Sequence, residues 1–423
     1  MNVSDTEIVK SVLQNDQFII IDNEKEADIV LLNTCSVREN ANRKVYQRIH
    51  KIKHDKNGAA VKIGVLGCMA TNFRTQLIED KKLPVDFIVG PDSYKRLPKL
   101  IKKIEETGEK GFDVTLSEFE TYSDIYPTRE RGVNAWISVM RGCNNFCSFC
   151  VVPYTRGRER SRALDNIVDE VKRLADEGFK QVTLLGQNVN SYHHEGYHFA
   201  NLLEQVSRVN GIERIRFTSP HPKDFPHDVL HVVAENPKVC KHIHLPLQAG
   251  NSRILELMRR TYTQKEYLKL VEDIRRQDPE IVLTTDIIVG FPTETDEEFQ
   301  DTCHVVAEVE FDSAFIFKYS ERKGTLAHRK YPDDVAEEVK TERIMRLNEL
   351  QKAISLKKNR AHIGQVHQIL IEDKATKRSP EDIQGRNDGN KLVILPKGQL
   401  KIGDFVNVKI IDASANVLKG QLV

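Results

Sequence analysis

Short apolar runs alternate with polar helical segments over the first 110 residues. The runs at 27–35, 62–68 and 86–90 are continuous in aliphatic residues, which is typical of parallel strands buried on both faces. The segments between them, such as 39–51, carry apolar residues at helical spacing. This alternation predicts a doubly wound α/β domain over residues 1–110.

A second series of strands and helices follows residue 134. Helical segments such as 164–177 separate six further apolar runs, which predict six β/α units. The runs are 135–140, 181–186, 214–219, 242–247, 282–290 and 313–320. Six units are two fewer than a closed eightfold barrel contains. We therefore expect a partial, TIM-like barrel with an open side and with its chemistry at the C-terminal ends of the strands.

Three other segments complete the predicted organisation. Residues 111–134 are polar, acidic and without periodicity, so we interpret them as a linker. A charged helix over 335–361 closes the barrel domain, which spans 135–361. Residues 362–423 are rich in strand and turn signals and predict a small antiparallel barrel of the OB type. The fold class is therefore α/β with a C-terminal β-barrel.

Composition narrows the class of protein without naming it. Of 423 residues, 39% are hydrophobic and 30% charged, which fits globular domains with buried cores. No run approaches the ~18 apolar residues of a membrane span, and nothing at the N-terminus resembles a signal peptide, so we expect a cytoplasmic protein. The net charge of +1 means that a polyanionic partner would depend on local basic clusters.

Three cysteines, Cys143, Cys147 and Cys150, form the most informative motif. Their C-x3-C-x2-C spacing provides three thiolates to a [4Fe–4S] cube and leaves the fourth iron open to the amine and carboxylate of S-adenosylmethionine. Bacterial ferredoxin runs are tighter and contain four cysteines. Zinc or plain structural thiols are the alternatives, but zinc sites pair two such units and no second unit follows. The spacing is typical of radical-SAM enzymes, and it makes these three residues the candidate catalytic cysteines.

Four other cysteines divide into two kinds. Cys35 and Cys68 each follow an apolar run, where open parallel sheets place their ligands, so we favour metal ligation over a core position. Cys240 and Cys303 have no partner at ligand spacing, and we interpret them as inert core thiols.

Polar residues cluster after the predicted barrel strands and are candidates for binding the cofactor. They are Gly186, Gln187, Asn188, Ser219, His221, Gln248 and Asp286. His244 lies near them in the sequence, but histidines at the rim of a barrel commonly form local hydrogen bonds. An ordinary strand-to-helix turn is the alternative interpretation of Gly186. Asp286 lies within a strand, where an unpaired carboxylate is costly, so we expect it to pair with a cation or a cofactor hydroxyl.

Long collinear motifs connect the chain to a known family. They are Asn-Thr-Cys-Ser-Val-Arg-Glu-Asn-Ala (33–41), Gly-Val-Leu-Gly-Cys-Met (64–69), Cys-Ser-Phe-Cys-Val-Val-Pro-Tyr-Thr-Arg-Gly-Arg-Glu (147–159), Leu-Leu-Gly-Gln-Asn-Val-Asn (184–190), Thr-Ser-Pro-His-Pro (218–222), His-Leu-Pro-Leu-Gln-Ala-Gly (244–250) and Thr-Thr-Asp-Ile-Ile-Val-Gly-Phe-Pro (284–292). Through them the chain resembles the radical-SAM methylthiotransferases along essentially its whole length, and within them the branch that acts on isopentenyladenosine in tRNA. Its C-terminal segment resembles the RNA-binding TRAM module.

The resemblance implies an activity and its cofactors. It implies two [4Fe–4S] clusters, one on the three catalytic cysteines together with S-adenosylmethionine, and an auxiliary one with Cys35 and Cys68 among its three ligands. It implies transfer of a methylthio group to C2 of N6-isopentenyladenosine beside the anticodon. Radical chemistry suits this target because an aromatic C–H has neither an acidic proton nor a leaving group. The implied partners are tRNA, a one-electron reductant, and a sulfur donor or iron–sulfur assembly proteins.

One departure concerns the auxiliary cluster. In the family its first cysteine lies in a Gly-Cys-Gln-Met-Asn run, and this chain begins at that Met. The third ligand and the first strand are therefore missing from the sequence as given, and the auxiliary cluster is incomplete in it. We expect the natural start to lie upstream.

Basic residues provide the expected RNA contacts. Alternating arginines follow the cysteine motif, at Arg156, Arg158, Arg160 and Arg162, and guanidinium groups favour phosphate. We expect the first three to bind RNA, together with Lys377, Arg378 and Arg386 of the C-terminal module. A solvated protein edge is the alternative for the arginine run.

Two other functions stay open at this point. A sister methylthiotransferase would act on threonylcarbamoyl-modified adenosine or on a ribosomal protein, but the motifs at 153–159 and 244–250 resemble the isopentenyl branch. A non-catalytic RNA-binding or iron–sulfur sensing protein would use the same parts. The intact cysteine triplet argues against it, and reductive cleavage of S-adenosylmethionine would distinguish the two.

Overall fold

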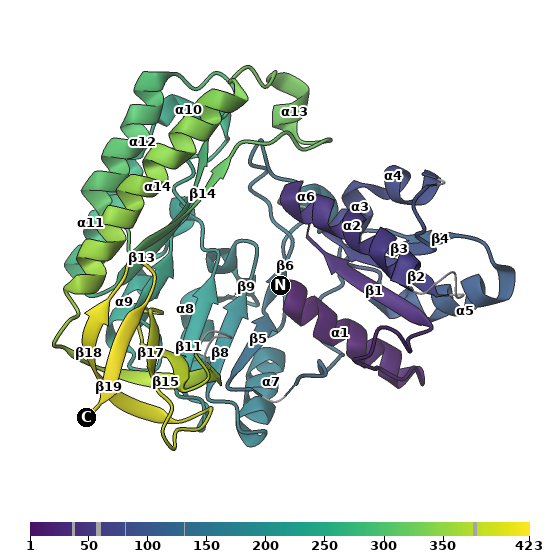
Figure 1. Ribbon diagram of the computed structural model, residues 1–423, viewed down its shortest axis with the longest axis horizontal. Helices are drawn as coiled ribbons and strands as arrows, with labels where there is room; N and C mark the ends of the chain where they lie inside the picture. The colour runs from purple at the N-terminus through teal and green to yellow at the C-terminus, as the bar shows by residue number, and fades with distance from the viewer. Residues whose placement is uncertain (36–38, 56–60, 81, 131, 375–378) are drawn as a thin grey trace. The chain divides into compact units, whose positions relative to one another are not determined.

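The computed structural model describes residues 1–35, 39–55, 61–80, 82–130, 132–374 and 379–423 (Figure 1). The chain forms two compact units. The first unit comprises 1–130, 140–162 and 322–329, and the second comprises 131–139, 163–321 and 330–423. The cysteine triplet therefore belongs to the first unit together with Cys35 and Cys68.

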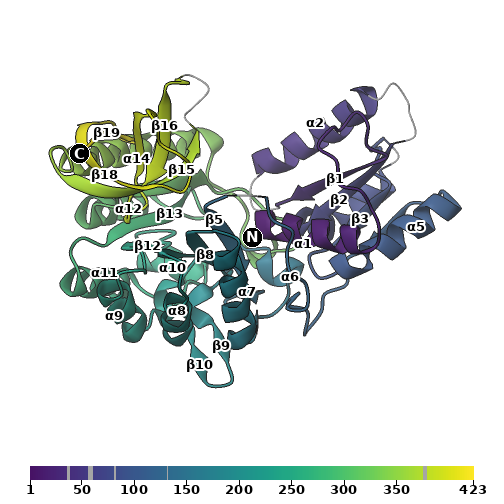
Figure 2. The same ribbon diagram turned by 90° about the horizontal axis from the view of Figure 1, so that it is seen from below.

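A parallel four-stranded sheet forms the centre of the first unit. Its strands are β1 (Ile29–Thr34), β2 (Lys62–Gly67), β3 (Phe87–Val89) and β4 (Gly111–Asp113), in that order. One hydrophobic core lies between the sheet and helices α1 (Asn2–Asn15) and α5 (Leu97–Thr107). A second core lies under α2 (Glu39–Asp55), α3 (Cys68–Asn72) and α4 (Arg74–Glu79). Figure 2 shows α1 and α2 on opposite faces of the sheet, which confirms the doubly wound prediction.

The segment expected as a linker is instead partly built into this unit. Its first residues form β4, which pairs with β3. Tyr122 is buried and stacks on Tyr94 with ring centroids 5.7 Å apart. A strand of three residues is too short to give a periodic signal, which explains why the sequence pattern missed it.

Six parallel strands of the second unit form two three-stranded sheets. The first contains β5 (Asn134–Ser138), β8 (Gln181–Leu185) and β11 (Arg214–Thr218), and the second contains β12 (His242–His244), β13 (Val282–Val289) and β14 (Ser313–Lys318). A bridge between Ile215 and Val239 connects their neighbouring ends. The main covering helices are α7 (Leu164–Asp176), α8 (Phe199–Ser207), α9 (His227–Glu235), α11 (Gln264–Gln277) and α12 (Asp296–Val309). These six strands confirm the predicted partial barrel.

Shorter elements connect these strands and helices. They are η1 (Tyr94–Arg96), β6 (Met140–Arg141), α6 (Val152–Thr155), β7 (Arg160–Ser161), η2 (Val189–Ser191), β9 (His193–His194), β10 (Tyr197–His198), η3 (Pro222–Asp224), α10 (Ser252–Leu257) and α13 (Leu326–Lys330). In the described part of the chain, no helix is both long and apolar enough to span a bilayer.

A closed five-stranded barrel ends the second unit, as predicted. Its strands are β15 (Val366–Lys374), β16 (Asp382–Arg386), β17 (Leu392–Pro396), β18 (Phe405–Ala413) and β19 (Leu418–Leu422), in the spatial order β15-β16-β17-β19-β18. Helix α14 (Glu337–Arg360) precedes it. The buried face of this helix is largely polar, and Arg343 on it pairs with Glu294 at 2.9 Å.

The C-terminal barrel packs on the partial barrel through its β16–β17 turn, as the yellow strands beside β8 and β11 in Figure 1 illustrate. Arg216 of β11 donates to the carbonyl oxygens of Asn387 and Asp388, at 2.7 and 2.9 Å. Arg214 donates to the carbonyls of Arg386 and Gln368, at 2.7 and 2.8 Å. Because both guanidinium groups are buried, these contacts fix the small barrel to the strands.

Candidate functional site

The loop that carries Cys143, Cys147 and Cys150 is closed at its neck. Strands β6 and β7 pair Met140 with Ser161 and Arg141 with Arg160. Gly142 has φ +80°, and a Cβ there would lie 1.9 Å from the carbonyl oxygen of Arg158. Only glycine meets both demands, because other residues rarely adopt this φ and none can avoid the clash. The neck therefore holds the cysteine loop in one conformation.

Within the loop, backbone hydrogen bonds place the three thiols. The Cys143 N–H donates to the Gly157 carbonyl at 3.1 Å, and the Cys150 N–H donates to the Cys147 carbonyl at 3.0 Å. The Ala327 N–H donates to the Ser148 carbonyl at 2.7 Å. Cys143 and Cys147 are buried, and Cys150 is half-buried. The loop thus presents three thiols in a largely water-excluded setting.

Cys35 and Cys68 follow two neighbouring strands. Thr34 of β1 pairs with Gly67 of β2 in parallel register, so the two cysteines extend from the same edge of the sheet. Gly67 has φ +88°, and a Cβ there would lie 2.5 Å from the Thr34 carbonyl oxygen. This close approach brings the two strand ends together at the cysteines. The adjacency agrees with the expectation from strand position, while ligation itself remains a proposal.

The arginine run is mostly buried, which corrects one expectation. Arg156 donates to Asp5 Oδ2 at 2.6 Å and Arg160 to Asp92 Oδ1 at 3.0 Å, and both guanidinium groups are buried. An RNA phosphate cannot reach them, so neither is available for the RNA contact predicted from the sequence. Arg158 is exposed and lies over the Phe146 ring, 4.3 Å from its centroid.

The aspartates of this region have shifted pKa values of opposite sign. Burial raises the pKa of Asp5, but Arg156 and Arg141 outweigh burial and hold it below the ordinary value. Burial dominates at Asp92 and raises its pKa despite Arg141 and Arg160. Asp5 therefore stays ionised and anchors two arginines in the interior.

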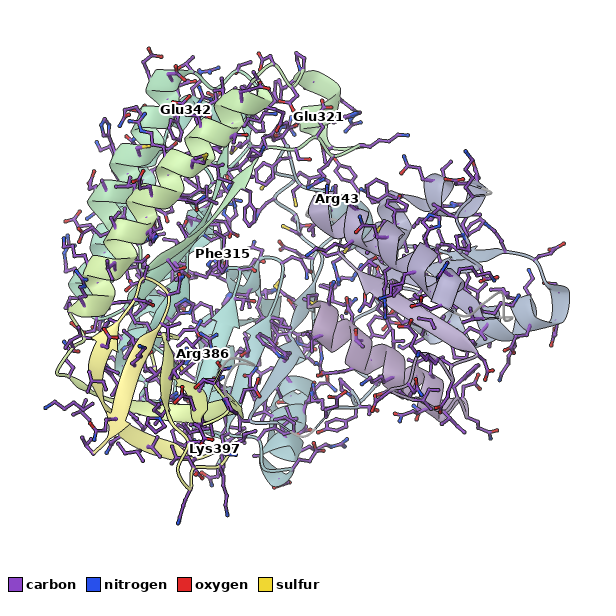
Figure 3. All side chains as sticks on the ribbon, viewed as in Figure 1. Arg43, Phe315, Glu321, Glu342, Arg386 and Lys397 are labelled. Carbon is purple, nitrogen blue, oxygen red and sulfur yellow. The ribbon has the colours of Figure 1, made fainter. Side chains whose placement is uncertain are left out.

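Of the three basic residues of the C-terminal module that we expect to bind RNA, the structure describes Arg386. Arg386 is half-buried, donates to the Asn390 carbonyl at 2.8 Å and pairs with Glu372 at 3.3 Å. Figure 3 places it on the C-terminal barrel. Its charge is thus already engaged within the protein. Lys377 and Arg378 lie outside the described residues.

The candidate cofactor residues of the second unit lie at strand ends. Gly186, Gln187 and Asn188 follow β8, and Ser219 follows β11 with φ +61°. Gln248 has φ +69°, and its backbone bridges to Ile287 of β13. These placements match the positions expected from the sequence pattern, whereas contact with a cofactor is left as a proposal.

His221 is held by a residue that sequence reasoning missed. The Asn190 side chain accepts from the His221 N–H at 2.7 Å and donates to the His221 carbonyl at 3.0 Å. His221 Nδ1 in turn accepts the Lys223 N–H at 3.2 Å. Burial, with Arg260 and Lys223 nearby, lowers the pKa of His221 to about 2. The Asn190 motif was visible in the sequence, but its partner was not, because the contact joins two separate strand ends.

Asp286 lies on β13 opposite a histidine of β12. His244 Nε2 is 3.3 Å from Asp286 Oδ2, and His244 Nδ1 is 3.0 Å from Thr284 Oγ1. The Asp286 side chain is one-third exposed. The polar partner of Asp286 is therefore a histidine of the neighbouring strand.

The donor chemistry of the cysteine loop fits an iron–sulfur cluster. Among the described residues, no three His, Cys, Asp or Glu side chains converge on a single ion. A cube does not need such convergence, because each thiolate binds a different iron. An all-thiolate set in a buried loop favours iron–sulfur clusters over hard cations such as magnesium or calcium.

Comparison with known proteins identifies the chain. The model of the radical SAM superfamily matches residues 137–306, that of the uncharacterized protein family UPF0004 matches 1–90, and that of the TRAM domain matches 360–423. The chain is 47% identical to the tRNA-2-methylthio-N(6)-dimethylallyladenosine synthase of Phocaeicola vulgatus, over 100% of this chain and 94% of that protein. The enzyme of the same name from Chloroherpeton thalassium is also 47% identical, over 99% and 93%. The chain belongs to the tRNA-2-methylthio-N(6)-dimethylallyladenosine synthase family.

Solved structures agree on the architecture of this family member. A radical S-adenosylmethionine methyltransferase, TsrM from Kitasatospora setae, has a structure with cobalamin and a [4Fe-4S] cluster bound that matches with a TM-score of 0.58. It is 17% identical, and the match covers 77% of this chain and 73% of that one. At this identity the likeness concerns the fold alone, which is that of a radical-SAM protein.

Proposed function

We propose that this chain transfers a methylthio group to C2 of N6-isopentenyladenosine, also called dimethylallyladenosine, next to the tRNA anticodon. The observation that carries the proposal is the 47% identity along the whole chain to synthases named for this product. It favours this target over the sister substrates, threonylcarbamoyl-adenosine and a ribosomal protein. The enzyme uses S-adenosylmethionine and [4Fe–4S] chemistry, as a member of the radical SAM superfamily.

We assign the first cluster to Cys143, Cys147 and Cys150. When bound there, the cluster and S-adenosylmethionine supply a carbon radical, which the aromatic C–H target requires. The Gly142 neck and the turn at Cys147–Cys150 hold the thiols in place and keep water away from them. Orientation and exclusion of water are the protein's share of such chemistry.

We assign Cys35 and Cys68 to the second, auxiliary cluster. Their adjacency at one sheet edge supports this role. For S-adenosylmethionine, the proposed contacts are Gly186, Gln187, Asn188, Ser219, Gln248 and Asp286. His221 contributes through its neutral ring: Asn190 holds the His221 backbone, and the ring Nδ1 accepts the Lys223 N–H.

We place the RNA contacts on basic residues of the cysteine loop and of the C-terminal module. Arg158, Lys377 and Arg378 are the proposed phosphate partners, whereas Arg386 contributes less because its charge is paired internally. The anticodon loop is a suitable target, since a base in a loop can be unstacked and inserted into a pocket. A cytoplasmic location, a one-electron reductant and a sulfur donor complete the proposal, with functional domains at 1–110, 135–361 and 362–423.

Reductive cleavage of S-adenosylmethionine tests the first assignment. Anaerobically reconstituted protein should release 5′-deoxyadenosine when a reductant is added. The Cys147→Ser variant should release none, because the cluster loses a ligand. Cys303→Ser, which changes a buried thiol of α12 in the second unit, is the matched control and should retain the activity. Equal product from Cys147→Ser and the unaltered protein would contradict the assignment.

A further inference from the structure

Five buried charged residues of the first unit form one connected network, which we call the buried arginine–aspartate cluster: Asp5, Asp92, Arg141, Arg156 and Arg160. Asp5 accepts from Arg141 Nη1 at 3.0 Å and from Arg156 Nη2 at 2.6 Å. Asp92 accepts from Arg160 Nη2 at 3.0 Å and lies 3.8 Å from Arg141 Nε. Arg160 Nη2 also donates to the Arg156 carbonyl at 3.0 Å. The cluster joins helix α1, the end of β3 and both sides of the cysteine loop.

The cluster is not neutral by itself. Its three guanidinium groups carry three positive charges, and its two carboxylates carry two negative charges. Backbone carbonyls of Pro91 and Ser117 accept from Arg141 and Arg160, but they carry no net charge. A buried charge without a counter-charge is costly, so the interior of this unit favours one further anion.

The sulfur of Cys68 is positioned to be that anion. Arg156 Nε donates to Cys68 Sγ at 3.1 Å, and both residues are buried. The contact joins the helix that begins at Cys68, α3, to the segment that directly follows α6 and the cysteine triplet. A cysteine that ligates a metal does so as a thiolate, which supplies the missing negative charge.

The Arg156 guanidinium has a second donor available for a ligand. Its Nη1 atom is buried and has no hydrogen-bond acceptor among the described residues. Buried donors are rarely left unsatisfied in native structures. An inorganic sulfide of a cluster on Cys68 is an acceptor of the right kind.

We propose that Arg156 is a positioning residue for the auxiliary cluster, holding the Cys68 thiolate by a hydrogen bond and balancing its charge from the buried arginine–aspartate cluster. The inference rests on the proposed assignment of Cys35 and Cys68 as ligands. It gives Arg156 a role within the protein in place of the RNA contact expected from the sequence. Partners of metal ligands of this kind typically alter metal affinity 10–100-fold when they are changed.

The test isolates the auxiliary cluster. Cys143, Cys147 and Cys150 are changed to alanine in the protein expressed from its natural start, so that only the second site can assemble a cluster. In this background, Arg156→Gln removes the positive charge. Arg156→Lys keeps the charge but loses the planar set of guanidinium N–H donors. Arg160→Gln is the comparison variant, because Arg160 belongs to the same buried cluster: its loss removes one positive charge but leaves the hydrogen bond from Arg156 to Cys68 in place.

Two readouts report on the cluster and neither is enzyme activity. One is the rate of iron loss to a chelator, and the other is the reduction potential from a titration followed by electron paramagnetic resonance. Arg156→Gln should lose iron about 10–100-fold faster than the parent. Its potential should become more negative, because removing a donor and a positive charge disfavours the reduced cluster. Arg156→Lys and Arg160→Gln should both lie between the parent and Arg156→Gln, because each removes only part of what Arg156 supplies.

The possible results separate two kinds of failure. If Arg156→Gln and Arg160→Gln both behave like the parent, or lose iron equally fast, Arg156 has no specific role and the inference is overturned. If the parent itself binds no cluster, the assignment of Cys35 and Cys68 fails and the inference falls with it. If Arg156→Gln does not fold, Arg156→Lys decides by the same two readouts, and a lysine variant equal to the parent in potential overturns the requirement for a guanidinium.

Discussion

At the scale of single residues, Gly142 carries the sharpest constraint of the cysteine loop. Gly142→Ala places a Cβ 1.9 Å from the Arg158 carbonyl oxygen, in addition to about 1–3 kcal/mol for the left-handed φ. The loop must shift, so we expect the variant to bind less iron after anaerobic reconstitution and to cleave less S-adenosylmethionine. Gly178→Ala is the control, since Gly178 has φ +92° but open space around its Cβ position. Equal iron content in the two variants would show that the neck does not position the thiols.

His221 makes a second prediction at this scale, on pH dependence. Burial, Arg260 and Lys223 lower its pKa to about 2 in the folded protein, against about 6.5 when unfolded. Below pH 6.5 only the unfolded chain gains this proton, so the free energy of unfolding falls as pH falls. Between pH 7.5 and 5.5 the unaltered protein should lose about 1.4 kcal/mol more than His221→Gln, which retains an acceptor for the Lys223 N–H.

Denaturant unfolding at the two pH values measures this difference. His231→Gln, at an exposed histidine of α9, is the control and should lose stability as the unaltered protein does. The same pH dependence in His221→Gln and in the unaltered protein would mean that His221 titrates normally in the folded state.

For single residues, the sequence predicted where a residue lies in the fold better than which residues it bonds to. Cys35 and Cys68 were placed at one sheet edge because parallel strands end together. Arg156 and Arg160 were misplaced at the surface, because the pattern of alternating arginines is the same for a solvated edge as for buried ion pairs. Their partners, Asp5 and Asp92, lie far away in the sequence, and only the fold brings them near.

At the scale of elements, the β16–β17 turn fixes the C-terminal barrel to β11. Arg216→Gln removes the two hydrogen bonds to the carbonyls of Asn387 and Asp388 and leaves those carbonyls buried. Bonds from a charged donor are worth about 1.5–3 kcal/mol each and are not additive, so we expect a loss of about 3 kcal/mol in the free energy of unfolding. Urea denaturation measures it.

The control for this element is Arg208→Gln, at the exposed C-terminal end of α8. A surface change of this kind should stay within about 0.5 kcal/mol of the unaltered protein. If Arg216→Gln is no more destabilising than Arg208→Gln, the turn does not anchor the barrel.

Element prediction succeeded where runs were long and failed where they were short. The six barrel strands were visible because their apolar runs extend over six or more residues. Strand β4, Gly-Phe-Asp, contains a single apolar side chain, and its pairing with β3 depends on tertiary context. The packing of the C-terminal barrel on β11 could not be predicted from the sequence either. Arg214 and Arg216 lie in a strand pattern, and that pattern does not indicate that backbone carbonyls are their partners.

At the scale of the whole molecule, the C-terminal barrel has a proposed role in RNA binding and a role in stability, and deleting it would affect both. Removing residues 362–423 eliminates the proposed RNA contacts Lys377 and Arg378. It also removes the carbonyl acceptors of the buried Arg214, two of the acceptors of Arg216, and the Lys391 partner of Asp312, which lies at 2.7 Å. Substitution of Lys377 and Arg378 alone leaves these internal contacts in place, so it separates RNA binding from stability better than truncation does.

The central claim is that this chain adds a methylthio group to isopentenyladenosine in tRNA, with radical chemistry initiated at the cysteine triplet. Mass spectrometry of tRNA nucleosides tests it in a strain that lacks the gene and is complemented with the unaltered gene or with Cys147→Ala. We predict that 2-methylthio-N6-isopentenyladenosine is restored only by the unaltered gene, and that N6-isopentenyladenosine accumulates with Cys147→Ala. A full level of the methylthiolated nucleoside in the strain without the gene, or with Cys147→Ala, would contradict the account.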